Sequence, residues 1–246
     1  MAENNETPVA YIAGITGSIG QELAKRLINA GWRLGGFARN PDRLGDIEAT
    51  VVAADATDSA ALSDAFSELQ EKLGPPTAYV HCVGSILLKP AHITKDEEWA
   101  QTIDLNLNSA FYGLRSSVKA MKQGGSIVLI SSTAAQVGLP SHEAIAAAKG
   151  GVESLARSAA ATYASKGIRV NSVALGLVET NLSEAMLSSE TGRKISEAMH
   201  PLGRVGQPAD AASLIAWLAS EDASWVTGQC WACDGGVSSV RQKTKV

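Results

Sequence analysis

Residues 9–20 read VAYIAGITGSIG, and this stretch decides the fold. The first five residues, Val9–Ala13, are an apolar run of strand length without polar alternation, as expected for a strand covered on both faces. A glycine-rich turn follows at residues 14–20, and an amphipathic stretch begins at Ser18. Such a turn brings backbone N–H groups and the positive end of a helix dipole to one point, where a pyrophosphate can bind.

The alternation of strand-like and helix-like segments continues to the end of the chain. We expect further strands at residues 33–37, 50–54, 78–83, 126–131, 169–173 and 229–232. Helices are predicted at 18–30, 58–73, 102–122, 141–165 and 208–219, with a small helical lobe at 179–203. This order predicts an α/β fold: a Rossmann-type doubly wound, seven-stranded parallel sheet with helices on both faces. Because no repeat or long linker interrupts the pattern, we expect one dinucleotide-binding domain over residues 1–246.

Composition and charge exclude several classes of function. Of the 246 residues, 45% are hydrophobic and 19% charged, and the net charge is −4, which argues against a nucleic-acid binder or an anionic-membrane binder. Residues 1–8 are polar and acidic, without the apolar region of a secretory signal. No apolar run approaches the roughly 20 residues needed to span a bilayer. We therefore expect a cytoplasmic protein with no nucleic-acid or membrane partner.

The cysteines raise the question of a metal or redox site. Cys230 and Cys233 form a C-x-x-C pair, but no second Cys or His pair could complete a zinc site. Asp-Gly-Gly follows Cys233, where a redox motif would be followed by a helix. We interpret the pair as two small residues in a buried strand and predict no metal site.

Outside the glycine-rich turn, two residues bear on how the coenzyme binds: Arg39 and Asp55. The second predicted strand ends in Phe37-Ala38-Arg39, with no acidic residue to bind the adenine-ribose diol of NAD. The Arg39 guanidinium can fork onto a 2′-phosphate, so we predict that NADP(H) is preferred over NAD(H). Alternatively, Arg39 stacks on adenine or faces solvent. Asp55, just after the third strand, is placed to accept a hydrogen bond from the adenine amino group.

Taken together, these motifs resemble the short-chain dehydrogenase/reductase family over nearly the whole chain. The turn is similar to T-G-x-x-x-G-x-G, with Ala13 in place of the Thr and Ser18 in place of the middle Gly. The segment IRVNSVALGLVET at 168–180 is similar to the family segment that reaches the nicotinamide, with Leu175 in place of its Pro. The resemblance implies an oxidoreductase that uses NADP(H) on an unidentified small carbonyl or alcohol.

The resemblance, together with the turn and strand ends, defines the candidate site residues. The cofactor-binding set is Gly14, Thr16, Ser18, Ile19, Gly20, Arg39, Asp55, Gly84, Lys149, Gly176 and Thr180. The catalytic set is Asn106, Ser132, Lys149 and His142, of which the first three match the Asn, Ser and Lys of the family tetrad.

The fourth member of that tetrad, a Tyr, is replaced. Counting from Ser132 and from Lys149 leads to Ile145, which has no proton to give to the alkoxide formed in carbonyl reduction. His142 lies three residues earlier on the same helix face, and imidazole titrates near pH 6.5, so His142 is one candidate acid. A water held by Ser132, Asn106 and Lys149 is another. His81, at the end of the fourth strand, is a weaker candidate that we expect to fill space beside the adenosine.

Two functions therefore remain open: an oxidoreductase with a non-standard proton donor, and a catalytically silent NADP-binding sensor or scaffold. We expect a homodimer or homotetramer, because the resemblance implies a four-helix interface that the alanine-rich helix at 141–165 and the helix at 102–122 could form. Core packing is the competing explanation for those alanines. The lobe at 179–203 carries Met186, Leu187, Ile195 and Met199, and we expect it to cover the site with an apolar face.

Overall fold

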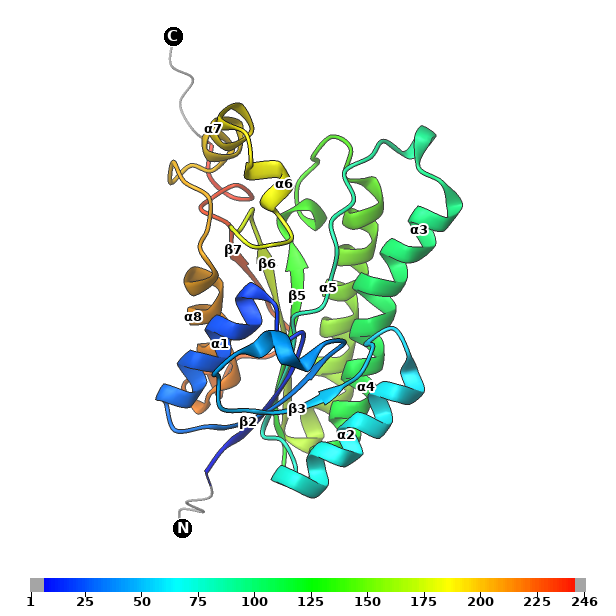
Figure 1. The fold of residues 1–246 in the computed structure, drawn as a ribbon, viewed down its shortest axis with the longest axis vertical. Coiled ribbons are helices and arrows are strands. Elements are labelled where there is room, and N and C mark those ends of the chain that lie inside the picture. The colour runs from blue at the N-terminus through cyan, green and yellow to red at the C-terminus, as the bar shows by residue number, and fades with distance from the viewer. Residues whose placement is uncertain (1–6, 242–246) are drawn as a thin grey trace.

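A single parallel sheet organises the molecule (Figure 1). The computed structural model describes residues 7–241, so residues 1–6 and 242–246 of the predicted domain, and most of the polar N-terminal segment, lie outside it. Seven strands of the described chain pair in the order β3-β2-β1-β4-β5-β6-β7, all parallel, as predicted. They are β1 Val9–Ala13, β2 Arg33–Ala38, β3 Thr50–Ala53, β4 Ala78–His81, β5 Gly125–Ser132, β6 Ile168–Leu175 and β7 Cys230–Cys233.

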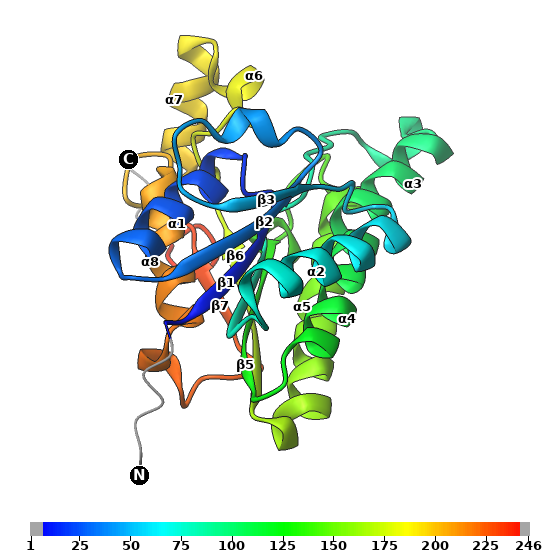
Figure 2. The same cartoon turned by 60° about the horizontal axis from the view of Figure 1, so that its bottom comes forward.

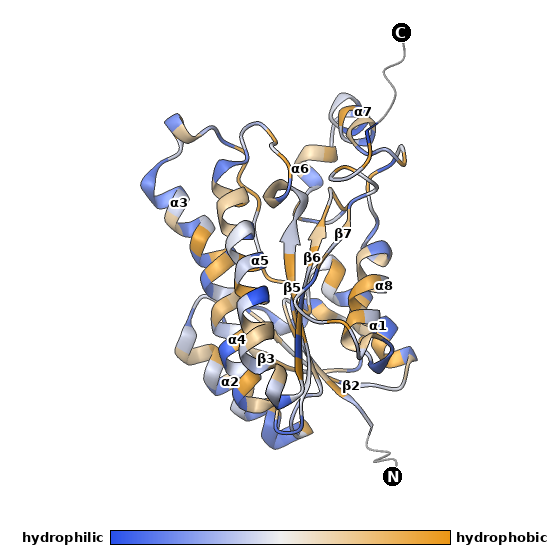
Figure 3. Cartoon of the chain, turned by 180° about the vertical axis from the view of Figure 1, so that it is seen from behind, coloured by the Kyte–Doolittle hydropathy of each residue, from blue (hydrophilic) through white to orange (hydrophobic). Residues whose placement is uncertain are grey.

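Helices cover both faces of the sheet (Figure 2). Helices α1 (Ser18–Asn29) and α8 (Pro208–Ala219) pack on one face, and α2 (Ser59–Leu73), α4 (Ser109–Ala120) and α5 (Glu143–Tyr163) pack on the other. Each face has its own apolar core, because alternate side chains of each strand point to opposite sides. In Figure 3 hydrophobic residues concentrate on β6 and α8, while α2 and α4 carry hydrophobic and hydrophilic residues on different sides.

The strand order reverses at β1, which pairs with β2 on one side and β4 on the other. The chain first winds outward from β1 to β3, then returns to β4 and winds outward in the opposite direction. Loops leaving the carboxyl ends of β1 and β4 therefore diverge to opposite faces and leave a crevice between them. All the predicted site residues except Asn106, in a helical turn described next, and Lys149, on α5, lie in or near such loops and strand ends.

The predicted helix at 102–122 differs from the structure. It starts earlier, as α3 (Asp96–Ile103), passes through a π-helical turn at Asp104–Asn108, and continues as α4. Three acidic residues occupy the first turn of α3, and the Lys95 N–H donates to the Glu98 carboxylate, which favours a helix start at this point. The wider π turn carries Asn106, and such turns often occur at functional sites.

Smaller differences concern the ends of elements. The predicted lobe contains two helices, α6 (Glu184–Leu187) and α7 (Glu190–Met199). Strand β4 ends at His81, two residues before the predicted end. In α5, Ala148 and Ala156 are buried in the core, whereas Ala147 and Ala161 are exposed. Within residues 7–241, no helix combines the length and apolar composition needed to cross a membrane.

The two cysteines of β7 point in opposite directions. Cys233 packs in the core shared with α1 and α8, whereas Cys230 accepts a hydrogen bond from Gln136 on the other side. The expectation of a buried strand is wrong, because β7 is an edge strand and its four residues are partly or fully exposed. In the described part of the chain, no group of three or more His, Cys, Asp or Glu side chains is placed to hold a metal ion.

Two helical glycines give a matched test of packing. An added Cβ at Gly113 in α4 would overlap the hydroxyl group of the buried Tyr79, whereas one at Gly150 in α5 would meet nothing. We expect Gly113→Ala to lower the free energy of unfolding by about 1–3 kcal/mol through overpacking. Gly150→Ala should raise it by about 0.5–1 kcal/mol, because alanine loses less backbone entropy in a helix. Urea unfolding of both variants measures this, and equal signs would contradict the described packing around Tyr79.

Candidate functional site

The glycine-rich turn forms the first part of the candidate site. Gly14 adopts a φ of +77°, its N–H donates to the Phe37 carbonyl at 2.9 Å, and its own carbonyl accepts from the Gly17 N–H at 3.0 Å. A side chain at Gly20 would collide with the Gly14 carbonyl, so the helix can approach the turn only with glycine at this position. No side chain caps the start of α1, whose first N–H groups are therefore available to an anion such as a pyrophosphate.

Three further residues of the turn were predicted to bind the cofactor. The Ser18 hydroxyl accepts from the Asn181 N–H at 3.3 Å, which links the turn to the segment after β6. The Thr16 carbonyl accepts from the Gln21 side chain at 3.1 Å, and its own side chain is half-buried. Ile19 lines a cavity described below. These hydrogen bonds connect the turn to α1 and to the segment after β6.

Arg39 and Asp55 lie at the carboxyl ends of neighbouring strands, β2 and β3. The Asp55 carboxylate accepts from the backbone N–H and the hydroxyl of Thr57, at 2.9 and 2.8 Å, and these bonds hold its pKa below the usual value. Asp55 is therefore ionised at neutral pH and has a second oxygen for an outside donor. Arg39 is exposed and forms no ion pair within residues 7–241, so its guanidinium is free to bind an anion.

A narrow cavity of about 150 Å³ brings together residues from distant parts of the sequence; we call it the inner cleft. It lies where β4, β5 and β6 end, next to the start of α1. Seven of the predicted site residues line it: Ile19, Gly84, Asn106, Ser132, Lys149, Gly176 and Thr180. Ile145 lines it as well.

Asn106 is fully buried in the π turn and completely hydrogen-bonded. Its side-chain amide donates to the Thr102 carbonyl and the Ser85 hydroxyl, both at 2.9 Å, and its oxygen accepts from the Ser85 N–H at 3.1 Å. Gly84 lies directly against it, because an added Cβ there would be 2.8 Å from the Asn106 oxygen and 3.3 Å from Lys149 Nζ. Asn106 therefore holds the segment after β4 in place.

Lys149 is a buried amine at the inner cleft. It is only 6% exposed, and Nζ donates to the Ile130 carbonyl at 2.8 Å. Burial lowers the pKa of Lys149 to about 8, because the ammonium form loses solvation. The neighbouring Cys82 remains a neutral thiol, since burial raises its pKa to about 12.

Ser132 and Ile145 connect the inner cleft to a second cavity. This cavity, the outer pocket, has a volume of about 400 Å³, and both residues line both spaces. The Ser132 oxygen accepts from the Ala134 N–H at 3.2 Å, so its proton can still be donated. Ile145 is 4% exposed and offers neither a donor nor an acceptor.

His142 lines the outer pocket but not the inner cleft. It precedes α5 as the N-cap residue, and its Nδ1 lies 2.7 Å from the Pro140 carbonyl. Because a carbonyl can only accept, Nδ1–H is the donor, and Nε2 is left without a protein partner in the described contacts. His142 thus shares a pocket with Ser132 and Ile145.

His81 does not reach either cavity. It is buried between β4 and α4, where Nδ1 lies 2.8 Å from the Tyr79 hydroxyl and Nε2 lies 3.0 Å from the Ser109 hydroxyl. Burial lowers the pKa of His81 to about 3, so it is neutral. The idea of His81 as a proton donor is therefore wrong; it ties the end of β4 to the first residue of α4.

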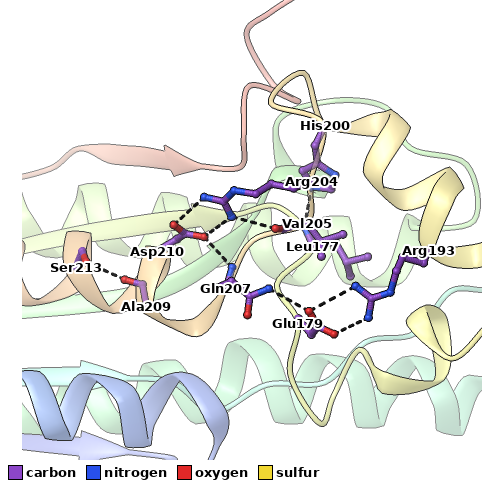
Figure 4. Close-up of polar contacts among 10 residues, drawn as sticks. All are labelled: Leu177, Glu179, Arg193, His200, Arg204, Val205, Gln207, Ala209, Asp210 and Ser213. Atoms are coloured by element: carbon purple, nitrogen blue, oxygen red, sulfur yellow. Dashed lines mark hydrogen bonds and ion pairs between the residues drawn. The ribbon is translucent and has the colours of Figure 1, made fainter.

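Two residues near the outer pocket were not singled out from the sequence. Asp234, in the turn after β7, accepts from the Thr133 hydroxyl and from the N–H groups of Gly236 and Ser238; burial would raise its pKa, but these bonds lower it. His200, at the end of the lobe, accepts the Leu177 N–H at 3.2 Å with Nε2 (Figure 4). The signal for Asp234 was its position just after a parallel strand, at the same edge as the other site residues.

Comparison with known proteins gives the family. A family model described as Enoyl-(Acyl carrier protein) reductase matches residues 14–238. A short-chain type dehydrogenase/reductase from Mycobacterium ulcerans has a similar structure, with a TM-score of 0.89 and 30% identity over 94% of this chain and 90% of that chain. The chain belongs to the short-chain dehydrogenase/reductase family. Its relatives are oxidoreductases.

Two curated relatives of this short-chain dehydrogenase/reductase differ in their reported activity. The inactive 2-(S)-hydroxypropyl-CoM dehydrogenase 2 of Xanthobacter autotrophicus is 36% identical over 195 residues, which cover 77% of this chain and 85% of that protein. The NADP-dependent (R)-specific alcohol dehydrogenase of Lentilactobacillus kefiri is 30% identical, over 97% of this chain and 100% of that protein.

The buried amine predicts an unusual dependence of stability on pH. Below pH 8, Lys149 is charged in both states, and folding must bury the charge; between pH 8 and 10.5 only the unfolded state keeps the proton, so stability should rise with pH. We expect Lys149→Met to raise the free energy of unfolding at pH 7 by about 1–3 kcal/mol in the ligand-free protein. The gain should shrink as pH rises from 8 towards 10.5.

Denaturant unfolding at several pH values measures this difference, with Lys119→Met, at an exposed position of α4, as the control. The control should change stability little at any pH. The burial of a charged amine would be contradicted if Lys149→Met had a lower free energy of unfolding than the wild type at pH 7, and if this difference were the same at every pH.

Proposed function

We propose that the chain is an NADP(H)-dependent oxidoreductase that acts on a small carbonyl or alcohol with a non-standard proton donor. The observation that carries this proposal is the convergence of Asn106, Ser132 and Lys149 on the inner cleft, beside a turn suited to a pyrophosphate. Ser132 and Ile145 line both this cleft and the outer pocket, where a substrate would lie. Family membership supports the same reaction type.

The residues present fit a phosphorylated adenine dinucleotide. The free N–H groups of α1 suit the pyrophosphate, the ionised Asp55 suits the adenine amino group, and the unpaired Arg39 suits the 2′-phosphate. The Lys149 ammonium would donate to the nicotinamide-ribose hydroxyls. When bound, the coenzyme donates or accepts the hydride. The (R)-specific alcohol dehydrogenase of L. kefiri is named NADP-dependent, which supports this choice of coenzyme.

The proton must come from a residue other than Ile145, the position where the family resemblance implies a Tyr. Ser132 can donate a hydrogen bond to the substrate oxygen and hold it in place. The Nδ1–H bond to the Pro140 carbonyl fixes the orientation of the His142 ring and leaves Nε2 free. His142 and Ser132 both line the outer pocket. In reduction the imidazolium gives its Nε2 proton to the oxygen of the new alcohol; in oxidation neutral Nε2 accepts the hydroxyl proton.

The second candidate is a catalytically silent NADP-binding protein, and Ile145 is the observation that favours it. An isoleucine at this point cannot take part in proton transfer, whatever the position of the substrate. A relative from X. autotrophicus is itself named an inactive dehydrogenase. Coenzyme binding is expected for both candidates, so turnover separates them.

The coenzyme preference has a direct test. Arg39→Ala should weaken NADP⁺ binding at least about tenfold, because one charge-assisted pair with the 2′-phosphate is lost, and should leave NAD⁺ binding nearly unchanged. Arg26→Ala, at an exposed position of α1, is the control. Isothermal titration calorimetry measures both coenzymes. If Arg39→Ala weakens NAD⁺ and NADP⁺ equally, Arg39 does not read the 2′-phosphate.

The proton donor is tested by variants on one helix. If the chain is an enzyme, His142→Ala should lower kcat by about 10²–10⁴ while NADPH binding stays unchanged. Reduction of a ketone panel, followed by the loss of NADPH absorbance, gives kcat. If the chain is silent, the wild type should show no turnover, and Ile145→Tyr should gain activity that Ile145→Phe, which lacks only the hydroxyl, does not. If the wild type is active and His142→Ala has the same kcat, the imidazole is excluded as the acid.

A further inference from the structure

We infer that the outer pocket selects neutral, apolar ketones or secondary alcohols with a single oxygen at the inner end, and rejects substrates that carry an anionic group. This inference rests on the proposed function, because it concerns the substrate of the same site. It depends on three properties of the pocket: its lining, the partners of its polar atoms, and the pairing of the cations around it.

The lining is apolar and contains no Asp, Glu, Lys or Arg side chain. Ten large aliphatic or thioether side chains form most of it: Ile86, Leu88, Leu139, Ile145, Leu175, Leu177, Met186, Ile195, Met199 and Val237. The volume of about 400 Å³ lies within the usual range for small-molecule sites. Two flexible methionines allow the walls to adapt to ligands of different shape.

Most polar groups of the pocket are already satisfied by the protein. The Thr133 hydroxyl donates to Asp234, and both ring nitrogens of His200 are used, Nε2 by the Leu177 N–H and Nδ1 by the Ser196 carbonyl. Among the described contacts, the Ser132 proton, the Nε2 atom of His142 and the Ser196 hydroxyl group have no partner in the protein. Ser132 and His142 line the pocket together with Ile145, and Ser132 also lines the inner cleft, so a substrate oxygen can receive a hydrogen bond where the two cavities meet.

The cations of the lobe, and Arg204 just after it, are paired with carboxylates and cannot turn towards a bound anion without losing their partners. Figure 4 shows Arg193 bonded to Glu179, which also accepts from Gln207, and Arg204 bonded to Asp210. Lys194, on the same helix as Arg193, is paired with Glu190. An anionic group in the outer pocket would lose its hydration without gaining a Lys or Arg partner, which is strongly unfavourable.

Part of the apolar wall is exposed at the mouth of the pocket. Ile86, Leu88, Ile195 and Met199 are each between 37% and 59% exposed although they are large and apolar. Such contiguous exposed apolar residues commonly mark a ligand site. An apolar ligand would cover them and gain further hydrophobic burial, which a charged group at the mouth would not provide.

Three probes with one skeleton test the inference: 4-phenylcyclohexanone, its para-carboxylate on the phenyl ring, and the methyl ester of that carboxylate. The ester keeps the size of the carboxylate and removes the charge. Binding is measured by calorimetry at pH 8 to protein saturated with NADP⁺, because a ketone cannot react with the oxidised coenzyme. We expect the ketone and the ester to bind within about fivefold of each other, and the carboxylate at least about 50-fold more weakly.

A charge introduced at the mouth should change this order. Met199→Lys places an ammonium at a half-exposed lining position and should strengthen carboxylate binding about fivefold or more, while ester binding weakens or stays the same. Thr191→Lys adds the same charge to an exposed position of α7 that does not line the pocket, and should have no such effect.

The outcomes separate this inference from the proposed function. Discrimination in binding without any turnover in the presence of NADPH would support the selectivity and refute the oxidoreductase. Turnover with the carboxylate bound as tightly as the ester would refute the selectivity and leave the oxidoreductase intact. If none of the three probes binds the NADP⁺-loaded protein, the outer pocket is not a site for apolar carbonyl compounds, and the inference fails.

Discussion

The reversal of strand order at β1 is the constraint on which the rest of the structure depends. Because β1 pairs with β2 and with β4, the loops that follow β1 and β4 must separate, and the crevice between them cannot be filled by a crossover helix. The two apolar cores on either side of the sheet hold this arrangement rigid. Most of the candidate site residues lie at this edge of the sheet.

Burial at that edge determines the chemistry of the site. Lys149 lies between Asn106, Gly84 and the end of β5, where the loss of hydration lowers its pKa to about 8 and the Ile130 carbonyl is its hydrogen-bond partner. Close by, the same apolar surroundings keep the Cys82 thiol neutral. An ammonium in such a place is costly to the fold, and a buried ionisable group with a shifted pKa at a cleft is a common feature of functional sites.

An isoleucine at position 145, where the family resemblance implies a Tyr, bears differently on binding and on catalysis. Ile145 joins the inner cleft to the outer pocket and makes their common wall apolar. In the function that we propose, a coenzyme would be bound by the turn, Arg39, Asp55 and Lys149, none of which needs a hydroxyl group at position 145. Proton transfer in that reaction would need a donor, and among the described residues His142 is the side chain that combines a free ring nitrogen with a place in the outer pocket.

The sequence by itself determined the order of strands and helices and the parallel sheet, because apolar runs and glycine turns are local properties of the chain. Asn106, Ser132 and Lys149 were identified by the spacing of motifs that resemble those of the family. It missed the early start of α3 and the π turn, where the capping bond from Lys95 to Glu98 and the packing of Asn106 on Ser85 decide the local geometry. It also misjudged His81, whose two partners come from β4 and α4. Only the tertiary structure decided which polar groups are satisfied and which remain free, because hydrogen-bond partners and burial depend on residues far apart in the chain.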